Sequence, residues 1–399
     1  MSFIMNIRSV AKYESKILVR SWFFRIFTLL AVVFLGFFNF AMMLMEDNFG
    51  LWFAKSVSSN IPYLNLLLLN TGQAVVAVFL SSEFLKRDKK LDTSEVFYVR
   101  PLSNAEYVVG KIWGNLRVFL FLNLLVLAIV LAFNFMASGV TVDLPAYLVY
   151  FFLISIPTLI FIIGLSIFLM LLLKNQALTF ILLLGYIGLT LFYIQDKFYY
   201  LFDYMVYNLP LFKSTIVGFS NLELILNHRA IYFFAGLGFI FFTIFLFKRL
   251  PNARRSHYPW LFLSFCMFLL MVTAGFRHVR SILWEGEMRA LYTSINNKYV
   301  YEPKMAIDYY DISVEQKSET IRSVVGMEGT ALAASEVFIF CLNPGLRVEE
   351  VKDGEKSLNF KREEQILAVD FGRKIEKGDT ISFSVSYEGR IKDDFCYLD

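Results

Sequence analysis

Seven uncharged, strongly apolar runs in the first 276 residues constrain the fold more than any other feature of the chain. They cover residues 26–45, 56–82, 118–137, 146–173, 177–194, 230–247 and 258–276. A helix rises about 1.5 Å per residue and the hydrocarbon core of a bilayer is about 30 Å thick, so about 20 residues cross it. The sequence therefore predicts a membrane all-α bundle of about seven transmembrane helices.

The charge of the chain divides at the end of these runs. Residues 1–276 hold 21 Lys and Arg against 12 Asp and Glu, whereas residues 277–399 hold 17 against 22. Hydrophobic residues make up 57% of the chain, above the roughly 45–50% of soluble domains. We therefore expect a lipid-embedded part, 1–276, and a water-soluble part, 277–399. The basic excess lies on short loops, so it requires no nucleic-acid partner.

The orientation is predicted from Lys and Arg in the loops. If the N-terminus is cytoplasmic, the cytoplasmic segments carry 17 of these residues and the opposite segments carry 4. Short loops rich in Lys and Arg stay in the cytoplasm. Seven spans then place residues 277–399 on the periplasmic or extracellular side.

The N-terminal segment 1–25 has an amphipathic pattern. One side of a helix would carry the apolar residues and the other the basic ones, which are Phe3, Ile4, Ile7, Val10 and Ala11 against Arg8, Lys12, Lys16 and Arg20. Such a helix lies on a membrane surface. The alternative is that this segment only flanks the first transmembrane helix and does not bind the membrane surface.

Residues 83–113 form a long polar segment between two apolar runs, and they contain KRDKKLDTSEVFYVRPLSNAEYVVGK. Pro101 favours an extended conformation at Arg100, and Ser103 or Asn104 can cap a following helix. We expect a pair of short cytoplasmic helices. A solvated connector without function is the alternative.

The order of residue types in this segment resembles the coupling region of type-2 ABC exporter permeases. The matching residues are Asp92, Glu95, Arg100, Pro101, Ser103, Asn104, Glu106, Tyr107, Gly110 and Lys111. The resemblance implies an ABC ATPase subunit at the cytoplasmic face and a second permease copy or half. It also implies that segment 1–25 is an elbow helix. The residues expected to contact the ATPase are Asp92, Glu95, Tyr98, Arg100, Pro101, Asn104 and Glu106.

The segment 195–229 is too aromatic for a free loop, and Asp203, Pro210 and Lys213 interrupt it. Tyr favours the membrane interface, so we expect short helices half-sunk in the outer leaflet. Type-2 exporters carry a re-entrant element at this position.

Polar residues inside the predicted spans must find partners, usually on another helix. Asn65, Asn70, Gln73 and Asn123 are therefore candidates either for helix packing or for lining a transport path, and Gly185 and Gly188 join them. No Asp, Glu, Lys or Arg lies at mid-span, which argues against ion-coupled transport.

The C-terminal part reads as a juxtamembrane helix, 277–305, followed by an antiparallel β module, 306–399. Apolar residues alternate with serines along Ile381–Tyr387, and Asp353-Gly354 and Lys377-Gly378-Asp379 mark turns. The sequence of this part resembles the start of the N-terminal β domain of aminopeptidase N class zinc metallopeptidases. The resemblance implies that the domain is incomplete. Cys341 and Cys396 either pair in a disulfide or stay free.

Two catalytic signatures are missing from the sequence. It has no G-x-x-x-x-G-K-[ST], and its three histidines, His228, His257 and His278, form no H-E-x-x-H. We therefore expect no catalytic, metal or cofactor-binding residue in this chain, with ATP and Mg bound by the partner ATPase.

The sequence as a whole predicts a non-enzymatic permease subunit of an ABC exporter in a bacterial inner membrane. A membrane anchor for an aminopeptidase-like metallopeptidase is the alternative, and a module that grips a cell-envelope partner is a third.

Overall fold

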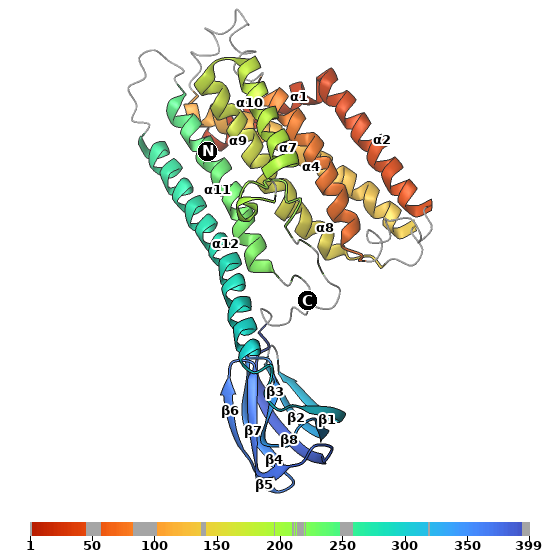
Figure 1. Ribbon diagram of the computed structural model, residues 1–399. Helices are drawn as coiled ribbons and strands as arrows, with labels where there is room; N and C mark the ends of the chain where they lie inside the picture. The colour runs from red at the N-terminus through yellow and green to blue at the C-terminus, as the bar shows by residue number, and fades with distance from the viewer. Residues whose placement is uncertain are drawn as a thin grey trace, which may run out of the picture. The chain divides into compact units, whose positions relative to one another are not determined.

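The computed structural model describes residues 2–44, 57–82, 102–136, 141–194, 196–209, 211, 213, 219, 221–247, 258–317 and 320–392. The chain divides into two compact units, Met1–Val279 and Arg280–Asp399. The first unit is helical, and the second consists mainly of β-strands (Figure 1).

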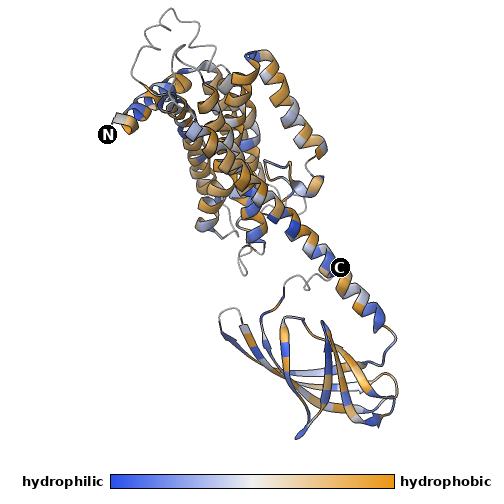
Figure 2. Cartoon of the chain, turned by 90° about the vertical axis from the view of Figure 1, so that its left-hand side faces the viewer, coloured by the Kyte–Doolittle hydropathy of each residue, from blue (hydrophilic) through white to orange (hydrophobic). Residues whose placement is uncertain are grey.

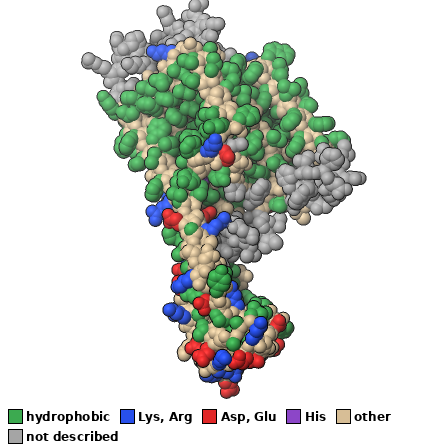
Figure 3. Space-filling view, viewed as in Figure 1, with side chains coloured by type: hydrophobic (Ala, Val, Ile, Leu, Met, Phe, Trp, Pro, Cys, Tyr) green, Lys and Arg blue, Asp and Glu red, His purple; other side chains and the backbone are tan. Residues whose placement is uncertain are grey.

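Among the described residues, seven helical stretches are long and apolar enough to cross a membrane, in agreement with a multi-pass membrane protein. They are α2 (Trp22–Leu44), α4 (Asn60–Ser82), α7 (Asn104–Met136), α8–η1–α9 (Leu144–Tyr150, Phe151–Ser155, Ile156–Leu173), α10–η2 (Gln176–Leu189, Thr190–Ile194), α11 (Leu222–Leu246) and α12 (Tyr258–Lys298). Hydrophobic residues predominate along these helices in Figure 2 and on the visible surface of this unit in Figure 3. The predicted number of long apolar helices is confirmed.

Three helices extend beyond the predicted spans. Helix α7 begins at Asn104 rather than near residue 118, α11 begins at Leu222 rather than 230, and α12 continues without a break from the predicted span 258–276 to Lys298. The second short helix expected in segment 83–113 is therefore the start of α7. The spans were drawn where charges stop, but α7 and α11 continue through charged residues whose side chains find partners in the protein, and α12 continues through exposed ones.

The helices of the first unit approach each other closely at glycines. The N-terminal helix α1 (Ser2–Arg20) packs along α7, and α9 packs along α11. A Cβ atom at Gly114 would lie 2.9 Å from the carbonyl oxygen of Ala11, and one at Gly236 would lie 2.7 Å from the backbone of Ile160. These two helix pairs are thus nearly in backbone contact.

The second unit contains two antiparallel sheets, with strand orders β1-β2-β8-β4-β5 and β3-β7-β6. The strands are β1 (Met305–Lys317), β2 (Thr320–Ala331), β3 (Ser335–Cys341), β4 (Leu346–Asp353), β5 (Lys356–Ser357), β6 (Asn359–Glu363), β7 (Ile366–Ile375) and β8 (Thr380–Gly389). Alternate residues of β8 (Ile381, Phe383 and Val385) are buried in the core with Phe338 and Phe371, as the period-two pattern predicts. The predicted antiparallel β module is confirmed.

The last turns of α12 pack on the three-stranded sheet of the second unit. Gln365 is fully buried, and its Nε2 donates to the carbonyl oxygen of Tyr292 at 2.8 Å and to Oδ1 of Asn296 at 3.0 Å. Ile295 packs against Ile339 and Ile366. On the same sheet Cys341 is a free, exposed thiol. Cys396 lies outside the described residues.

Candidate functional site

The predicted coupling residues fall partly outside the described chain. Asp92, Glu95, Tyr98, Arg100 and Pro101 lie outside the described residues. Asn104 and Glu106 are described, and both lie in the first turn of α7.

Ser103 and Glu106 form a capping box at the start of α7. The backbone N–H of Ser103 donates to Glu106 Oε2 at 2.6 Å, and the N–H of Glu106 donates to Ser103 Oγ at 3.2 Å. This reciprocal pair satisfies backbone donors that have no helical partner. The predicted cap at Ser103 is confirmed, although it begins a 33-residue helix rather than a short one.

Two other helices hold the same end of α7. Asn104 Nδ2 donates to the carbonyl oxygen of Phe247, the residue after α11, at 2.6 Å, and the Tyr107 ring stacks on the Phe247 ring with centroids 5.4 Å apart. From α1, Asn6 Nδ2 donates to Glu106 Oε1 at 2.9 Å. The start of α7 is therefore tied to α1 and to the end of α11.

Further along α7, charged residues face α1 rather than solvent. Lys111 Nζ lies 3.9 Å from Glu14 Oε2, and both side chains are only 4% exposed. Arg117 donates to Ser15 Oγ at 2.5 Å and to the carbonyl oxygen of Ala11 at 2.8 Å. The basic residues Arg8, Lys12, Lys16 and Arg20 of α1 remain exposed, whereas Glu14 is buried.

The four candidate path residues are buried and bonded to side chains of other helices. Asn65 exchanges two amide hydrogen bonds with Asn39 of α2, at 2.7 and 3.1 Å. Asn123 donates to Gln73 at 2.8 Å, and Asn70 donates to Asn123 at 3.2 Å. In the described conformation these side chains join α2, α4 and α7.

We call residues Phe198–Leu209, together with Leu211 and Lys213, the clamped segment. A second group of polar side chains surrounds this segment. The clamped segment contains one 3₁₀ turn, Phe198–Tyr200, and α11 begins at Leu222, while parts of the predicted segment 195–229 lie outside the described residues. The φ angles of Phe198, Tyr199 and Tyr200 are 53°, 59° and 62°. Side chains with a Cβ rarely adopt this left-handed region, at a cost of roughly 1–2 kcal/mol each. Contacts from neighbouring helices must hold this turn.

These contacts are hydrogen bonds from side chains to the carbonyl groups of the clamped segment. The pairs are His278 to Tyr199 (2.8 Å), His228 to Tyr200 (3.0 Å), Tyr232 to Leu201, Thr158 to Tyr204 (3.2 Å), Arg229 to Tyr204 (3.0 Å) and Tyr63 to Val206 (3.1 Å). The donors come from α4, α9, α11 and α12. Because a carbonyl only accepts, the bonded nitrogen of each histidine carries the proton. The carbonyl groups of this irregular backbone are thereby satisfied by protein side chains.

Arg229 is the central donor of this set. Its side chain is 2% exposed and also reaches the π-helical turn η1 between α8 and α9, where Nε donates to the carbonyl oxygen of Leu153 at 2.7 Å. Pro157 has no N–H to offer that carbonyl, which explains why it is free to accept from Arg229. Asp203 lies nearby, and its burial raises the pKa of the carboxyl group, while backbone N–H bonds and Arg229 oppose this shift.

Arg229 shows that α11 begins earlier than the predicted span 230–247. The uncharged run was begun after Arg229, yet this residue lies two turns inside α11 and is buried. Sequence reasoning also missed Pro157. A proline within an uncharged run, combined with an arginine at the start of another, is the signal that points to this contact.

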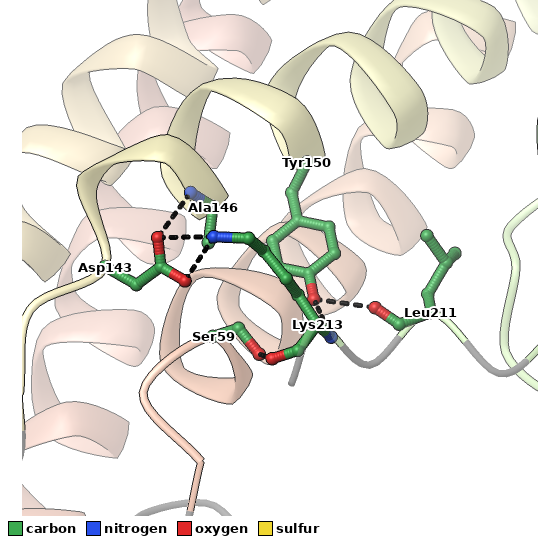
Figure 4. Close-up of polar contacts among 6 residues, drawn as sticks. All are labelled: Ser59, Asp143, Ala146, Tyr150, Leu211 and Lys213. Atoms are coloured by element: carbon green, nitrogen blue, oxygen red, sulfur yellow. Dashed lines mark hydrogen bonds and ion pairs between the residues drawn. The ribbon is translucent and has the colours of Figure 1, made fainter. Parts of the chain in front are cut away.

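Lys213 is held at three points (Figure 4). Its Nζ lies 2.8 and 2.6 Å from the carboxylate oxygens of Asp143, the N-cap of α8. Its backbone N–H donates to Tyr150 Oη at 3.2 Å, and its carbonyl oxygen accepts from Ser59 Oγ at 2.8 Å. The Tyr150 hydroxyl in turn donates to the carbonyl oxygen of Leu211 at 2.6 Å.

Metal-binding chemistry is not favoured by the described side chains. Within the described ranges, no three His, Cys, Asp or Glu residues gather closely enough to hold a metal ion.

No protein-family model matches the chain, so none supports the resemblance to exporter permeases. No curated protein matches it either. Two similar solved structures are variants of M1 zinc metallopeptidases, one from Deinococcus radiodurans bound to a Tyr-Ser-Ala substrate and one a two-domain enzyme bound to L-tryptophan. Each is 17% identical with a TM-score of 0.21, over 22% of this chain and 21% of the other. The chain thus spans about a fifth of the length of these structures.

Proposed function

We propose that this chain is the permease subunit of an ATP-driven exporter of the type-2 ABC class, working in a bacterial inner membrane with a separate ATPase subunit. The partner subunit would bind ATP and Mg, and a second permease copy or half would complete the path. The chain itself would catalyse no reaction.

The observation that carries the proposal is the attachment of the start of α7, which lies within the polar segment 83–113, to neighbouring helices. Within a few residues, Ser103 and Glu106 form the capping box, Asn104 binds the end of α11, and Glu106 binds α1. A displacement of the polar segment would therefore act on α1, α7 and α11 together. An inert connector requires no such attachment.

The close packing of α1 on α7 favours transmission of this displacement. Gly110 and Gly114 bring the two helices nearly into backbone contact, and the buried Lys111–Glu14 pair fixes their register. Closely packed helices move as rigid bodies, because interiors at this density deform little. Helices α1 and α7 would then move together as one rigid body.

The coupling contact is tested by charge reversal. We expect Glu95→Lys and Arg100→Glu to lower binding of the ATPase subunit, or its stimulation, by about 30-fold or more. Removing one partner of a desolvated interfacial charge pair costs roughly 2 kcal/mol or more, and each 1.4 kcal/mol is a factor of ten. The measurement is ATPase activity of the co-purified complex in nanodiscs.

Lys361→Glu, on the exposed face of β6, is the matched control and should leave the activity unchanged. If both loop variants bind and stimulate the ATPase as the parent does, the polar segment is a connector. The proposed function then fails and the membrane-anchor alternative gains.

The orientation is tested separately by thiol labelling in intact cells. We expect a membrane-impermeant reagent to label Ser382→Cys, which is exposed on β8, and not Ser256→Cys in the basic loop before α12. The reason is the bias of Lys and Arg toward cytoplasmic loops. Labelling in the reverse order would contradict the orientation and with it a cytoplasmic ATPase at the polar segment.

A further inference from the structure

We propose that Asp143 and Lys213 form a latch that holds the end of the clamped segment over the start of α4, and that this end is released when the ion pair breaks. The latch is a property of the helical unit, so it stands independently of the proposed function. If the chain is an exporter subunit, opening of the latch is a step in its cycle.

The geometry makes Lys213 the point at which the end of the clamped segment is fastened. Its ammonium group, its N–H and its carbonyl oxygen each have a partner, and these partners are Asp143, Tyr150 and Ser59 (Figure 4). Tyr150 also holds Leu211, so one hydroxyl bridges two positions of the segment. Loss of the ammonium contact leaves only hydroxyl bonds, which water replaces readily.

The pair has intermediate exposure, which suits a contact that opens. The side chains of Lys213 and Asp143 are 20% and 12% exposed. More exposed pairs, such as Arg322–Glu349 in the β module at 59% and 42%, are screened by water and contribute little to stability. The Glu14–Lys111 pair, at 4% exposure, is closed to water. The Asp143–Lys213 pair is shielded enough from water for its two charges to attract each other strongly. It is also accessible enough for water to stabilise the charges once they separate.

The residues beneath the latch are buried. Ser59 and Tyr150 are fully buried, and Tyr63 at the start of α4 is 4% exposed. Release of Lys213 would expose Ser59 first, because the Ser59 hydroxyl is bonded to the Lys213 backbone. A thiol at position 59 therefore reports latch opening directly.

The experiment measures the rate at which a water-soluble maleimide modifies Ser59→Cys in purified protein whose native cysteines, Cys266, Cys341 and Cys396, are replaced by serine. Asp143→Asn is the informative variant, because Asn keeps the N-cap of α8 and removes only the charge. We expect it to raise the rate about tenfold, the factor that corresponds to 1.4 kcal/mol. Lys213→Met should do the same, and reversing both charges together should return the rate toward that of the parent.

The control thiol is Ser155→Cys, a fully buried position in the polar network with Asn70 and Asn123. The latch requires this thiol to stay unreactive in the variants that open position 59. Unchanged rates at position 59 in both single variants would overturn the proposal. A parallel rise at both positions would also overturn it, because the pair would then hold the whole bundle rather than the segment. Neither outcome depends on an ATPase.

Discussion

Replacing Arg229 by alanine is expected to destabilise the helical unit by about 3–5 kcal/mol, because a buried acceptor left without its donor costs about 1–3 kcal/mol and several are affected. Its guanidinium group bonds the carbonyl oxygens of Leu153, Ile154 and Tyr204 and the hydroxyl of Thr158. Alanine would leave these acceptors buried without their donor. Because 1 kcal/mol shifts the melting temperature of a domain of this size by roughly 2–4 °C, we expect a fall of about 10 °C in a thermal melt of purified protein.

Arg277→Ala is the matched control, because it removes the same side chain from an exposed position on α12. It should change the melting temperature by no more than about 1–2 °C, as surface substitutions usually cost under 0.5 kcal/mol. Arg229→Lys should fall between the two, since an ammonium group keeps the charge without the planar fork of donors. Equal melting temperatures for Arg229→Ala and the control would contradict a central role for this contact.

The class of fold could be predicted from the sequence because long apolar runs and period-two alternation are local signals. The alternation along Ile381–Tyr387 correctly indicated a core strand, and Gly354 and Gly378 do occupy turns with positive φ. Helix ends were less predictable. Glu106 and Lys111 looked like markers of a cytoplasmic loop, yet partners on α1 allow α7 to contain them.

The polar centres could be predicted only in part, because their members come together from distant parts of the chain. Asn65 and Asn123 were identified as polar residues that need partners, but the partners Asn39 and Gln73 follow from packing, which no local pattern contains. Arg229 was assigned to the interfacial segment 195–229 because the run of uncharged residues begins after it. Its role depends on the carbonyl group freed by Pro157 on a different helix.

Replacing Gly236 by valine is expected to separate α9 from α11. A Cβ at this position would lie 2.7 Å from backbone atoms of Ile160 and Phe161. Likewise, a Cβ added at Gly164 of α9 would lie 2.6 Å from the carbonyl oxygen of Gly236. Backbone atoms cannot turn aside as a flexible side chain can, so one helix must shift. Overpacking of this kind costs about 1–3 kcal/mol and occasionally more. We expect the upper end of this range, measured as a lower melting temperature of the purified protein.

Gly185→Val in α10 is the matched control, because a Cβ there meets no atom within 4 Å. Valine has a slightly higher helix propensity than glycine, so this variant should be as stable as the parent or more stable by up to about 0.5 kcal/mol. Both glycines lie inside long apolar helices and look alike in the sequence. A difference in stability between the two valine variants would therefore come from the surroundings of each glycine. If both valine variants melt together with the parent, α9 and α11 are not held in backbone contact.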